Sequence, residues 1–181
     1  EEELHFQNDS LFMRLWSSGK TSTGRALFLV HGFGEQSGRY MHFPHYLRGS
    51  VDAIGAIDLP GHGKSAGIRG HCENFDQIRD AAIAGFEFLR SRLSAQGQSV
   101  QMHWMGHSMG GLTSLKVAEV GANLPVKSMI LSAPLLALSM PVPPLKAFFG
   151  KLIEPLMPRL KLANEIDGAR VSRDPSVVEE Y

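Results

Sequence analysis

The residues best suited to chemistry stand in the sequence GHSMGG at 106–111, which fits the pattern G-x-S-x-G. In this pattern a serine occupies a tight turn between a strand and a helix, and glycines avoid collisions with the neighbouring backbone. An apolar run at 99–105 is typical of a buried strand, and residues 111–125 have helical spacing followed by a glycine and a proline. We therefore predict that Ser108 is a nucleophile for acyl transfer.

Acyl transfer also needs hydrogen-bond donors for the carbonyl oxygen that becomes negative in the tetrahedral intermediate. The backbone N–H of Met109, directly after the serine, is one candidate, and that of Phe33 in HGFG at 31–34 is the other. By itself HGFG could be a simple turn at the end of a strand. Together with GHSMGG, the HGFG turn is expected to supply the second N–H donor of an oxyanion hole.

Three histidines stand in glycine-rich loops, and each could in principle be the general base. They are His31, His62 and His107. Since His31 and His107 directly precede the two turns, their side chains are better placed to brace those turns than to reach the Ser108 hydroxyl. We expect His62 to hold the loop PGHGKS. No carboxylate-and-histidine pattern has the spacing of metal ligands, so we expect no metal.

The bulk properties indicate a single α/β domain with a substantial core, because 181 residues carry 18 basic and 18 acidic side chains and an ordinary apolar share. The absence of a basic cluster argues against nucleic acid as a partner. The apolar stretches are broken before the roughly 20 residues that a bilayer span needs. Cys72 is the single cysteine, which excludes an internal disulfide, and the acidic start EEELHFQ lacks the features of a signal peptide.

Four apolar segments are predicted strands: 10–19, 24–34, the first part of 51–67, and 126–134. The first two could pair as a hairpin. The sequences HGFG, DLPGHG, GHSMGG and LSAP follow the last three strands and the strand at 99–105. Such loops at the carboxyl ends of parallel strands are where open α/β sheets place their sites.

Two helices alternate with these strands. In 76–97 the residues Ile78, Ala82, Phe86, Leu89 and Leu93 form one apolar face. Asn74 or Asp76 could cap its start and Gly97 its end. The second helix follows Ser108, with Leu112, Leu115 and Val120 near helical spacing. The alternation predicts a mostly parallel sheet covered by helices on both faces.

Five segments together resemble the monoacylglycerol lipase and lysophospholipase family of α/β-hydrolases: HGFGEQSGRY, DLPGHGKSAG, GHSMGG, LSAP and DGARVSRDPSVVEEY. The similarity covers most of the chain from Leu27. It implies the α/β-hydrolase fold, Ser108 as nucleophile, Phe33 and Met109 as oxyanion donors, and hydrolysis of single-chain lipid esters through an acyl-enzyme without cofactor. A serine in place of the aspartate nucleophile of epoxide hydrolases and dehalogenases argues against those activities.

The chain departs from this family in one respect. The triad of α/β-hydrolases runs Ser, Asp or Glu, His, and no histidine follows His107 in this sequence. Asp167 and Asp174 do follow, but DGARVSRDP resembles the family segment before the acid-bearing strand, so neither is assigned. We expect the triad acid and base, the last two strands and the final helix in a C-terminal part of the same protein beyond Tyr181.

The resemblance and the composition divide the chain into 1–134, the N-terminal part of the hydrolase core, 135–165, a cap or lid, and 166–181, a return towards the core. The cap is proline-broken and apolar, with Leu145, Phe148, Phe149 and Leu152 at helical spacing as candidate acyl-binding residues. Ordinary core packing is the alternative for these side chains.

A lid of this kind would let a cytoplasmic protein contact membranes or lipid aggregates peripherally. Two other functions stay open at this point. One is a carboxylesterase for short, non-lipid esters, which the same serine chemistry would serve. The other is a ligand-binding homologue without catalysis, which the missing histidine keeps in consideration.

Overall fold

The computed structural model describes residues 1–8, 10–18, 23–97, 99–121, 123–137 and 173–179. The chain divides into two units, Glu1–Ser139 and Met140–Tyr181, which are treated separately. In the second unit the described helix is α5 (Pro175–Glu179). The candidate cap residues Leu145, Phe148, Phe149 and Leu152, and also Asp167, lie outside the described residues. The predicted division into core, cap and return segment therefore stays a prediction.

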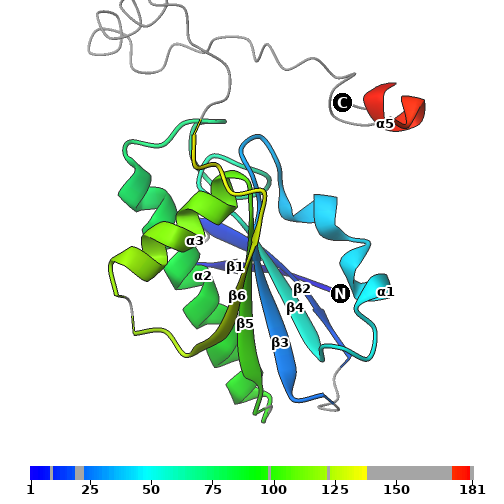
Figure 1. Ribbon diagram of the computed structural model, residues 1–181. Helices are drawn as coiled ribbons and strands as arrows, with labels where there is room; N and C mark the ends of the chain where they lie inside the picture. Colours follow the sequence, from blue (N-terminus) through cyan, green and yellow to red (C-terminus); the bar gives the residue numbers. More distant parts are fainter. Residues whose placement is uncertain (9, 19–22, 98, 122, 138–172, 180–181) are drawn as a thin grey trace, which may run out of the picture. The chain divides into compact units, whose positions relative to one another are not determined.

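The first unit is built on a six-stranded sheet with the order β1-β2-β4-β3-β5-β6 (Figure 1). Its strands are β1 (Glu2–Phe6), β2 (Leu11–Ser17), β3 (Arg25–Val30), β4 (Ala53–Asp58), β5 (Gln101–His107) and β6 (Val126–Ser132). The pairs β3–β4, β3–β5 and β5–β6 are parallel, whereas β1 and β2 are antiparallel at one edge. The mostly parallel sheet expected from the alternation of strands and helices is confirmed.

The predicted hairpin of 10–19 with 24–34 is wrong. Strand β4 lies between the two segments, because β2 pairs with it on one side and β3 on the other. The Asp52 carboxylate accepts hydrogen bonds from the backbone N–H groups of Thr23 (3.0 Å) and Gly24 (2.8 Å), and so fixes the start of β3 beside the start of β4. The partner of β2 on its other side is β1, a strand that the sequence analysis did not predict.

Helices cover both faces of the sheet (Figure 1). On one face lie α2 (Phe75–Ala95) and α3 (Met109–Glu119), and on the other η1 (Ser37–Tyr40) and α1 (Phe43–Tyr46). All five residues of the predicted apolar face of α2 are buried. The Asn74 side chain caps this helix by accepting a hydrogen bond from the Gln77 N–H (3.0 Å), and Gly97 follows the last turn with φ +73°.

The larger core cluster lies between the sheet and α2. Its centre is aromatic: the Phe28 ring meets Trp104 at a centroid distance of 4.7 Å and Phe86 at 5.8 Å, both edge to face. Residues 26–30 of β3 are buried on both faces, with Leu27 and Leu29 packing into a second cluster together with Tyr40 of η1. A strand apolar on both faces needs neighbours on both sides, which explains its central place.

Helix α3 packs on the sheet largely through small and polar residues, with Met109 and Val117 as its buried apolar side chains. Its buried residues include Gly110, Thr113 and Ser114, whereas Val120 is exposed. The Ser114 hydroxyl accepts a hydrogen bond from the Trp104 indole (2.7 Å). The apolar spacing in the sequence predicts the helix, but the glycines and hydroxyl residues form the face that allows close approach to the sheet.

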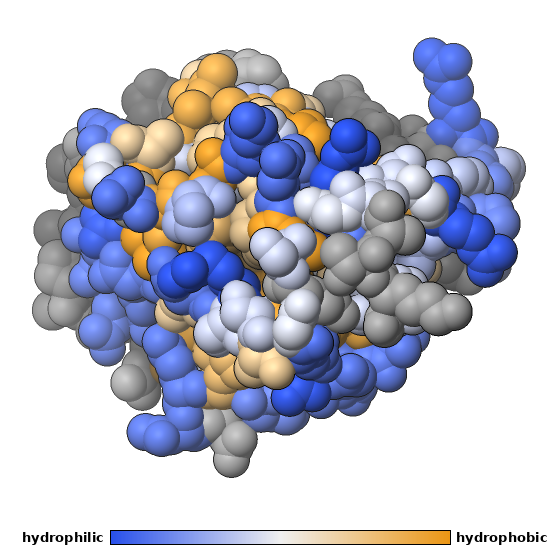
Figure 2. Space-filling model, turned by 90° about the horizontal axis from the view of Figure 1, so that it is seen from below, coloured by the Kyte–Doolittle hydropathy of each residue, from blue (hydrophilic) through white to orange (hydrophobic). Residues whose placement is uncertain are grey.

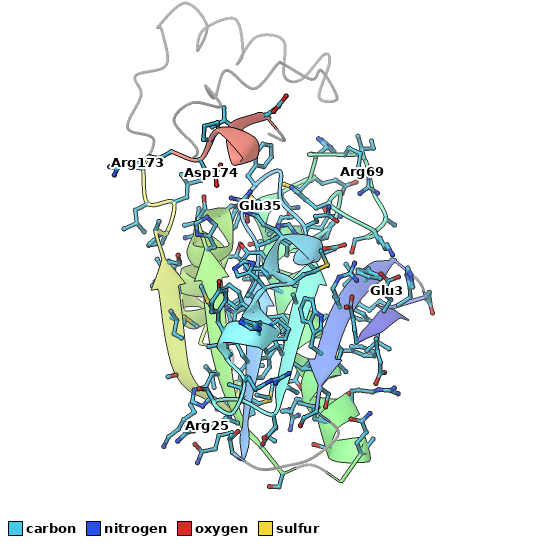
Figure 3. The ribbon with its side chains drawn as sticks, turned by 90° about the vertical axis from the view of Figure 1, so that its right-hand side faces the viewer. Glu3, Arg25, Glu35, Arg69, Arg173 and Asp174 are labelled. Carbon is cyan, nitrogen blue, oxygen red and sulfur yellow. The ribbon has the colours of Figure 1, made fainter. Side chains whose placement is uncertain are left out.

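The two ends of the sheet differ in character. Figure 2 views the amino ends of the parallel strands, where hydrophilic residues cover much of the surface and apolar ones show between them. The carboxyl ends lie opposite, and there the glycine-rich loops gather; Figure 3 shows Glu35 at this end and Arg25 at the other. None of the helices in the described part of the chain combines the length and apolarity needed to cross a bilayer.

Candidate active site

Ser108 lies at the junction of β5 and α3 with φ 51° and ψ −114°, a conformation that side-chain-bearing residues seldom adopt. Three backbone hydrogen bonds hold it there. The Ser108 N–H donates to the Ser132 carbonyl (3.0 Å), and the Ser108 carbonyl accepts from the N–H groups of Leu112 (3.1 Å) and Leu135 (3.0 Å). Such strain persists only where the surroundings fix it, as at a nucleophile elbow.

The glycines of GHSMGG permit this turn. A Cβ atom on Gly110 would overlap the backbone carbonyl of Val30, and one on Gly106 would overlap the carbonyl of Gly110. A Cβ on Gly111 would lie 2.8 Å from the Pro134 side chain. These contacts bring the start of α3 against the end of β3 and against the segment that follows β6. The three loops therefore meet around Ser108.

The predicted oxyanion turn lies against the serine. A Cβ atom on Gly32 would be 3.2 Å from the Ser108 Cβ. The Gly32 N–H donates to the Glu35 carboxylate (3.0 Å), whereas the Phe33 N–H has no acceptor among the described residues. Met109 is the first residue of α3, and the first N–H groups of a helix have no partner within it. Both predicted donors thus border the predicted nucleophile.

His31 is fully buried, and both ring nitrogens are used. Its Nδ1–H donates to the Gly32 carbonyl (2.7 Å), and its Nε2 accepts from the Leu59 N–H (3.0 Å). Burial lowers the pKa of this imidazole to about 4, so the ring is neutral near pH 7. These contacts agree with the predicted bracing role, because neither nitrogen is left for the Ser108 hydroxyl.

The loop DLPGHG is held mainly by a buried carboxylate. Asp58 accepts hydrogen bonds from the backbone N–H groups of Ser37 (2.6 Å) and Lys64 (2.7 Å). His62 is also buried, and its Nδ1–H donates to the Pro60 carbonyl (3.0 Å). Its ring lies 5.8 Å from that of Phe33, centroid to centroid. His62 therefore supports the loops, as predicted.

His107 contacts two neighbours at the ends of the strands. Its Nδ1 lies 3.2 Å from the Ser132 hydroxyl, and its Nε2 lies 3.8 Å from a Glu35 carboxylate oxygen. In the part of the chain that the structure describes, no histidine nitrogen is hydrogen-bonded to the Ser108 hydroxyl. Nor do the described residues contain a group of three or more His, Cys, Asp or Glu side chains that could hold a metal ion.

Glu35 is the residue of this site that the sequence analysis missed. It follows the HGFG turn at the carboxyl end of the sheet (Figure 3), and its side chain folds back so that the carboxylate accepts the Gly32 N–H. The signal that could have found it is an acidic residue three positions after a glycine whose N–H needs an acceptor. Its partners also include Tyr40 and Arg39 of η1.

Comparison with known proteins agrees with this geometry. The family model for serine aminopeptidase, S33, matches residues 21–181. Monoglyceride lipase of Mus musculus is 32% identical over 174 residues, which are 94% of this chain and 54% of that protein. Monoacylglycerol lipase of Mycolicibacterium smegmatis is 30% identical over 169 residues, 92% of this chain and 57% of that protein.

Among solved structures, the Paleococcus ferrophilus monoacylglycerol lipase superposes with a TM-score of 0.70 at 32% identity, covering 94% of this chain and 61% of that one. The chain thus spans little more than half the length of the two curated relatives above. The family match extends over most of the chain and includes the three loops that meet around Ser108. The chain belongs to the serine aminopeptidase S33 family of α/β-hydrolases.

Proposed function

We propose that the protein is a serine ester hydrolase that cleaves monoacylglycerols, lysophospholipids or similar single-chain lipid esters through an acyl-enzyme. The observation that carries the proposal is the strained backbone of Ser108 with the HGFG turn directly against it. The names of the relatives, monoglyceride and monoacylglycerol lipases, support the substrate class.

The chemistry follows from this arrangement. The Ser108 hydroxyl oxygen attacks the ester carbonyl carbon, and its proton passes to a base that lies outside the described residues. The carbonyl oxygen becomes an oxyanion, which the N–H groups of Phe33 and Met109 stabilise. The C–O bond to the alcohol then breaks, and the alcohol leaves with the proton from the base. Water, deprotonated by the same base, attacks the acyl-Ser108 ester. The bond from the acyl carbon to the Ser108 oxygen then breaks, the base returns its proton to that oxygen, and the fatty acid leaves.

The segment 135–165 is proposed to be the cap that receives the acyl chain. Leu145, Phe148, Phe149 and Leu152 would supply its apolar lining, as their helical spacing indicates. We further propose that the protein acts in the cytoplasm and meets membranes or lipid aggregates peripherally. Fractionation of cells into soluble and membrane pools tests this placement.

The function is tested with the full-length protein that contains this chain. Four substrates are compared: a long-chain monoacylglycerol, a lysophospholipid, a short-chain p-nitrophenyl ester and an aminoacyl anilide. The proposal predicts the highest kcat/KM on one of the two lipid esters. Preference for the short ester would favour a general carboxylesterase, and preference for the anilide would favour an aminopeptidase. No turnover together with no fluorophosphonate labelling of Ser108 would favour a non-catalytic homologue.

A further inference from the structure

We propose that Glu35 is a positioning residue that fixes Gly32 in the conformation needed to present the Phe33 N–H to the oxyanion. This proposal rests on the proposed ester hydrolysis and deepens it. Glu35 itself does not touch the reacting atoms. It acts through the backbone of the turn that lies against Ser108.

Glu35 holds Gly32 from both sides. Its carboxylate oxygen Oε2 accepts the Gly32 N–H at 3.0 Å, and its own backbone N–H donates to the Gly32 carbonyl at 3.3 Å. The same carbonyl accepts the His31 Nδ1–H at 2.7 Å. Glycine has wide conformational freedom, so these three hydrogen bonds are what restrict its φ and ψ angles.

The direction of the Phe33 N–H follows from peptide geometry. The Gly32 carbonyl and the Phe33 N–H belong to one planar trans peptide, and in such a unit the two bonds point in opposite directions. Because His31 and Glu35 hold the carbonyl, the Phe33 N–H must point away from them. The Gly32 N–H already donates a hydrogen bond to the Glu35 carboxylate. It is therefore not available as an oxyanion donor in place of the Phe33 N–H.

The carboxylate is itself held in place. The Tyr40 hydroxyl donates to Oε2 at 2.8 Å, while the other oxygen lies 3.1 Å from Arg39 Nε and 3.8 Å from His107 Nε2. Only 13% of the Glu35 side chain is exposed. Burial and the neighbouring carboxylate raise the pKa of Tyr40 above its usual range, so the phenol stays protonated and remains a donor.

The test compares three substitutions of Glu35 in the full-length protein, with kcat and KM measured on a monoacylglycerol. E35A removes the acceptor, and E35D keeps the charge but shortens the side chain. E35Q keeps an amide oxygen that can accept from both Gly32 and Tyr40. We expect kcat to fall about 10²-fold in E35A and E35D, since loss of one oxyanion donor costs about 10²–10³-fold. In E35Q, kcat should stay within about tenfold of the wild type.

The KM of all three variants should change less than about twofold, because the interaction acts only in the transition state. Affinity for a boronic acid, which forms a tetrahedral adduct with the serine, should fall in parallel with kcat/KM. E119A removes an exposed carboxylate of α3 and should leave both constants unchanged. A merely structural role for Glu35 would lower the amount of folded enzyme without this separation of kcat from KM.

Two results would overturn the proposal. One is an E35A or E35D enzyme whose kcat stays within twofold of the wild type. The other is an E35Q enzyme as impaired as E35D, which would show that an oxygen able to accept from Gly32 and Tyr40 does not preserve the activity. If E35A does not fold, E35D and E35Q decide by themselves. An inactive wild type that fails to label at Ser108 would instead refute the proposed function, and the Glu35 proposal with it.

Discussion

Ser108 combines two properties, a hydroxyl and a positive φ angle, that separate substitutions can isolate. Both S108A and S108G should abolish fluorophosphonate labelling and lower turnover by several powers of ten, as removal of a triad member does. S108G should also raise the free energy of unfolding by about 1 kcal/mol, because glycine removes the backbone strain at this φ angle. Labelling by mass spectrometry and denaturant unfolding measure the two effects.

The exposed serine at position 94 provides the control for this experiment, and S94A should label normally. Undiminished labelling of S108A would show that another residue is the nucleophile. An S108G protein less stable than the wild type would contradict the interpretation of the turn as strained.

Because the pKa of His31 is low in the folded protein, we predict that the free energy of unfolding depends on pH. In the unfolded chain a histidine binds a proton near pH 6.5, but in the folded protein His31 binds one only near pH 4. Between these values the unfolded state holds more protons, so the free energy of unfolding falls as the pH falls from 6.5 to 4, by at most about 1.4 kcal/mol per pH unit. Urea unfolding at several pH values measures this slope.

Substitution of His31 by glutamine tests whether His31 causes this change of the free energy of unfolding with pH. H31Q keeps a donor and an acceptor but has no titratable ring, so its slope in this range should be smaller. H42Q, which replaces an exposed histidine, should keep the slope of the wild type. Equal slopes for the wild type and H31Q would contradict the assignment.

At the scale of elements, the start of α3 packs tightly against the end of β3. G110A places a methyl group against the Val30 carbonyl, which is backbone and cannot turn aside. The start of α3 must then move, and Ser108 and Met109 move with it. We expect the free energy of unfolding to fall by about 1–3 kcal/mol, as overpacking does, and kcat to fall at least about tenfold because a small misplacement costs catalysis.

G38A is the matched control for this prediction. A Cβ on Gly38 would lie 3.6 Å from an oxygen of the Gln36 side chain, which is ordinary van der Waals contact. The variant should therefore unfold and react much like the wild type. A G110A enzyme with unchanged kcat would show that the start of α3 tolerates displacement.

The candidate cap gives a prediction about substrate length. Replacing Phe148 and Phe149 with serine should harm long-chain monoacylglycerol hydrolysis more than hydrolysis of a short soluble ester, because an apolar lining binds mainly the long chain. The ratio of the two kcat/KM values measures the effect. Equal loss on both substrates would favour ordinary core packing for these residues.

Local sequence patterns predicted the helices and strands better than they predicted which strands pair with each other. The apolar face of α2 and the strand before Ser108 were evident because their spacing is local. The hairpin prediction failed because adjacency in sequence does not determine partners when a later strand, here β4, fits between them. In the site, Ser108 and its glycines follow from a motif. The fold-back of Glu35 depends on Gly32 and Tyr40, which only the structure brings together.

At the scale of the whole molecule, β6 is an edge strand with exposed apolar side chains. Among the described residues it pairs with β5 alone, and the side chains of Ile130 and Leu131 are 49% and 37% exposed. An uncovered apolar edge strand invites aggregation. We predict that the 181-residue chain by itself aggregates and hydrolyses esters at least about 10³-fold more slowly than the full-length protein, because no histidine nitrogen of the described residues is hydrogen-bonded to the Ser108 hydroxyl.

Size-exclusion chromatography and ester hydrolysis of the 181-residue chain and of the full-length protein make this comparison. Addition of the separate C-terminal part should restore activity if the two parts associate. A monomeric and fully active 181-residue chain would show that the base lies within it, and His31, His62 and His107 would then have to be reconsidered.

The hydrogen bond from the Leu135 N–H to the Ser108 carbonyl also bears on how such enzymes diversify. It fastens the backbone to the nucleophile at the first residue of the segment 135–165. If this segment is the cap proposed above, the attachment separates the backbone of the reactive serine from the residues that contact the substrate. We then expect sequence changes beyond Leu135 to alter specificity while the Ser108 backbone keeps its geometry.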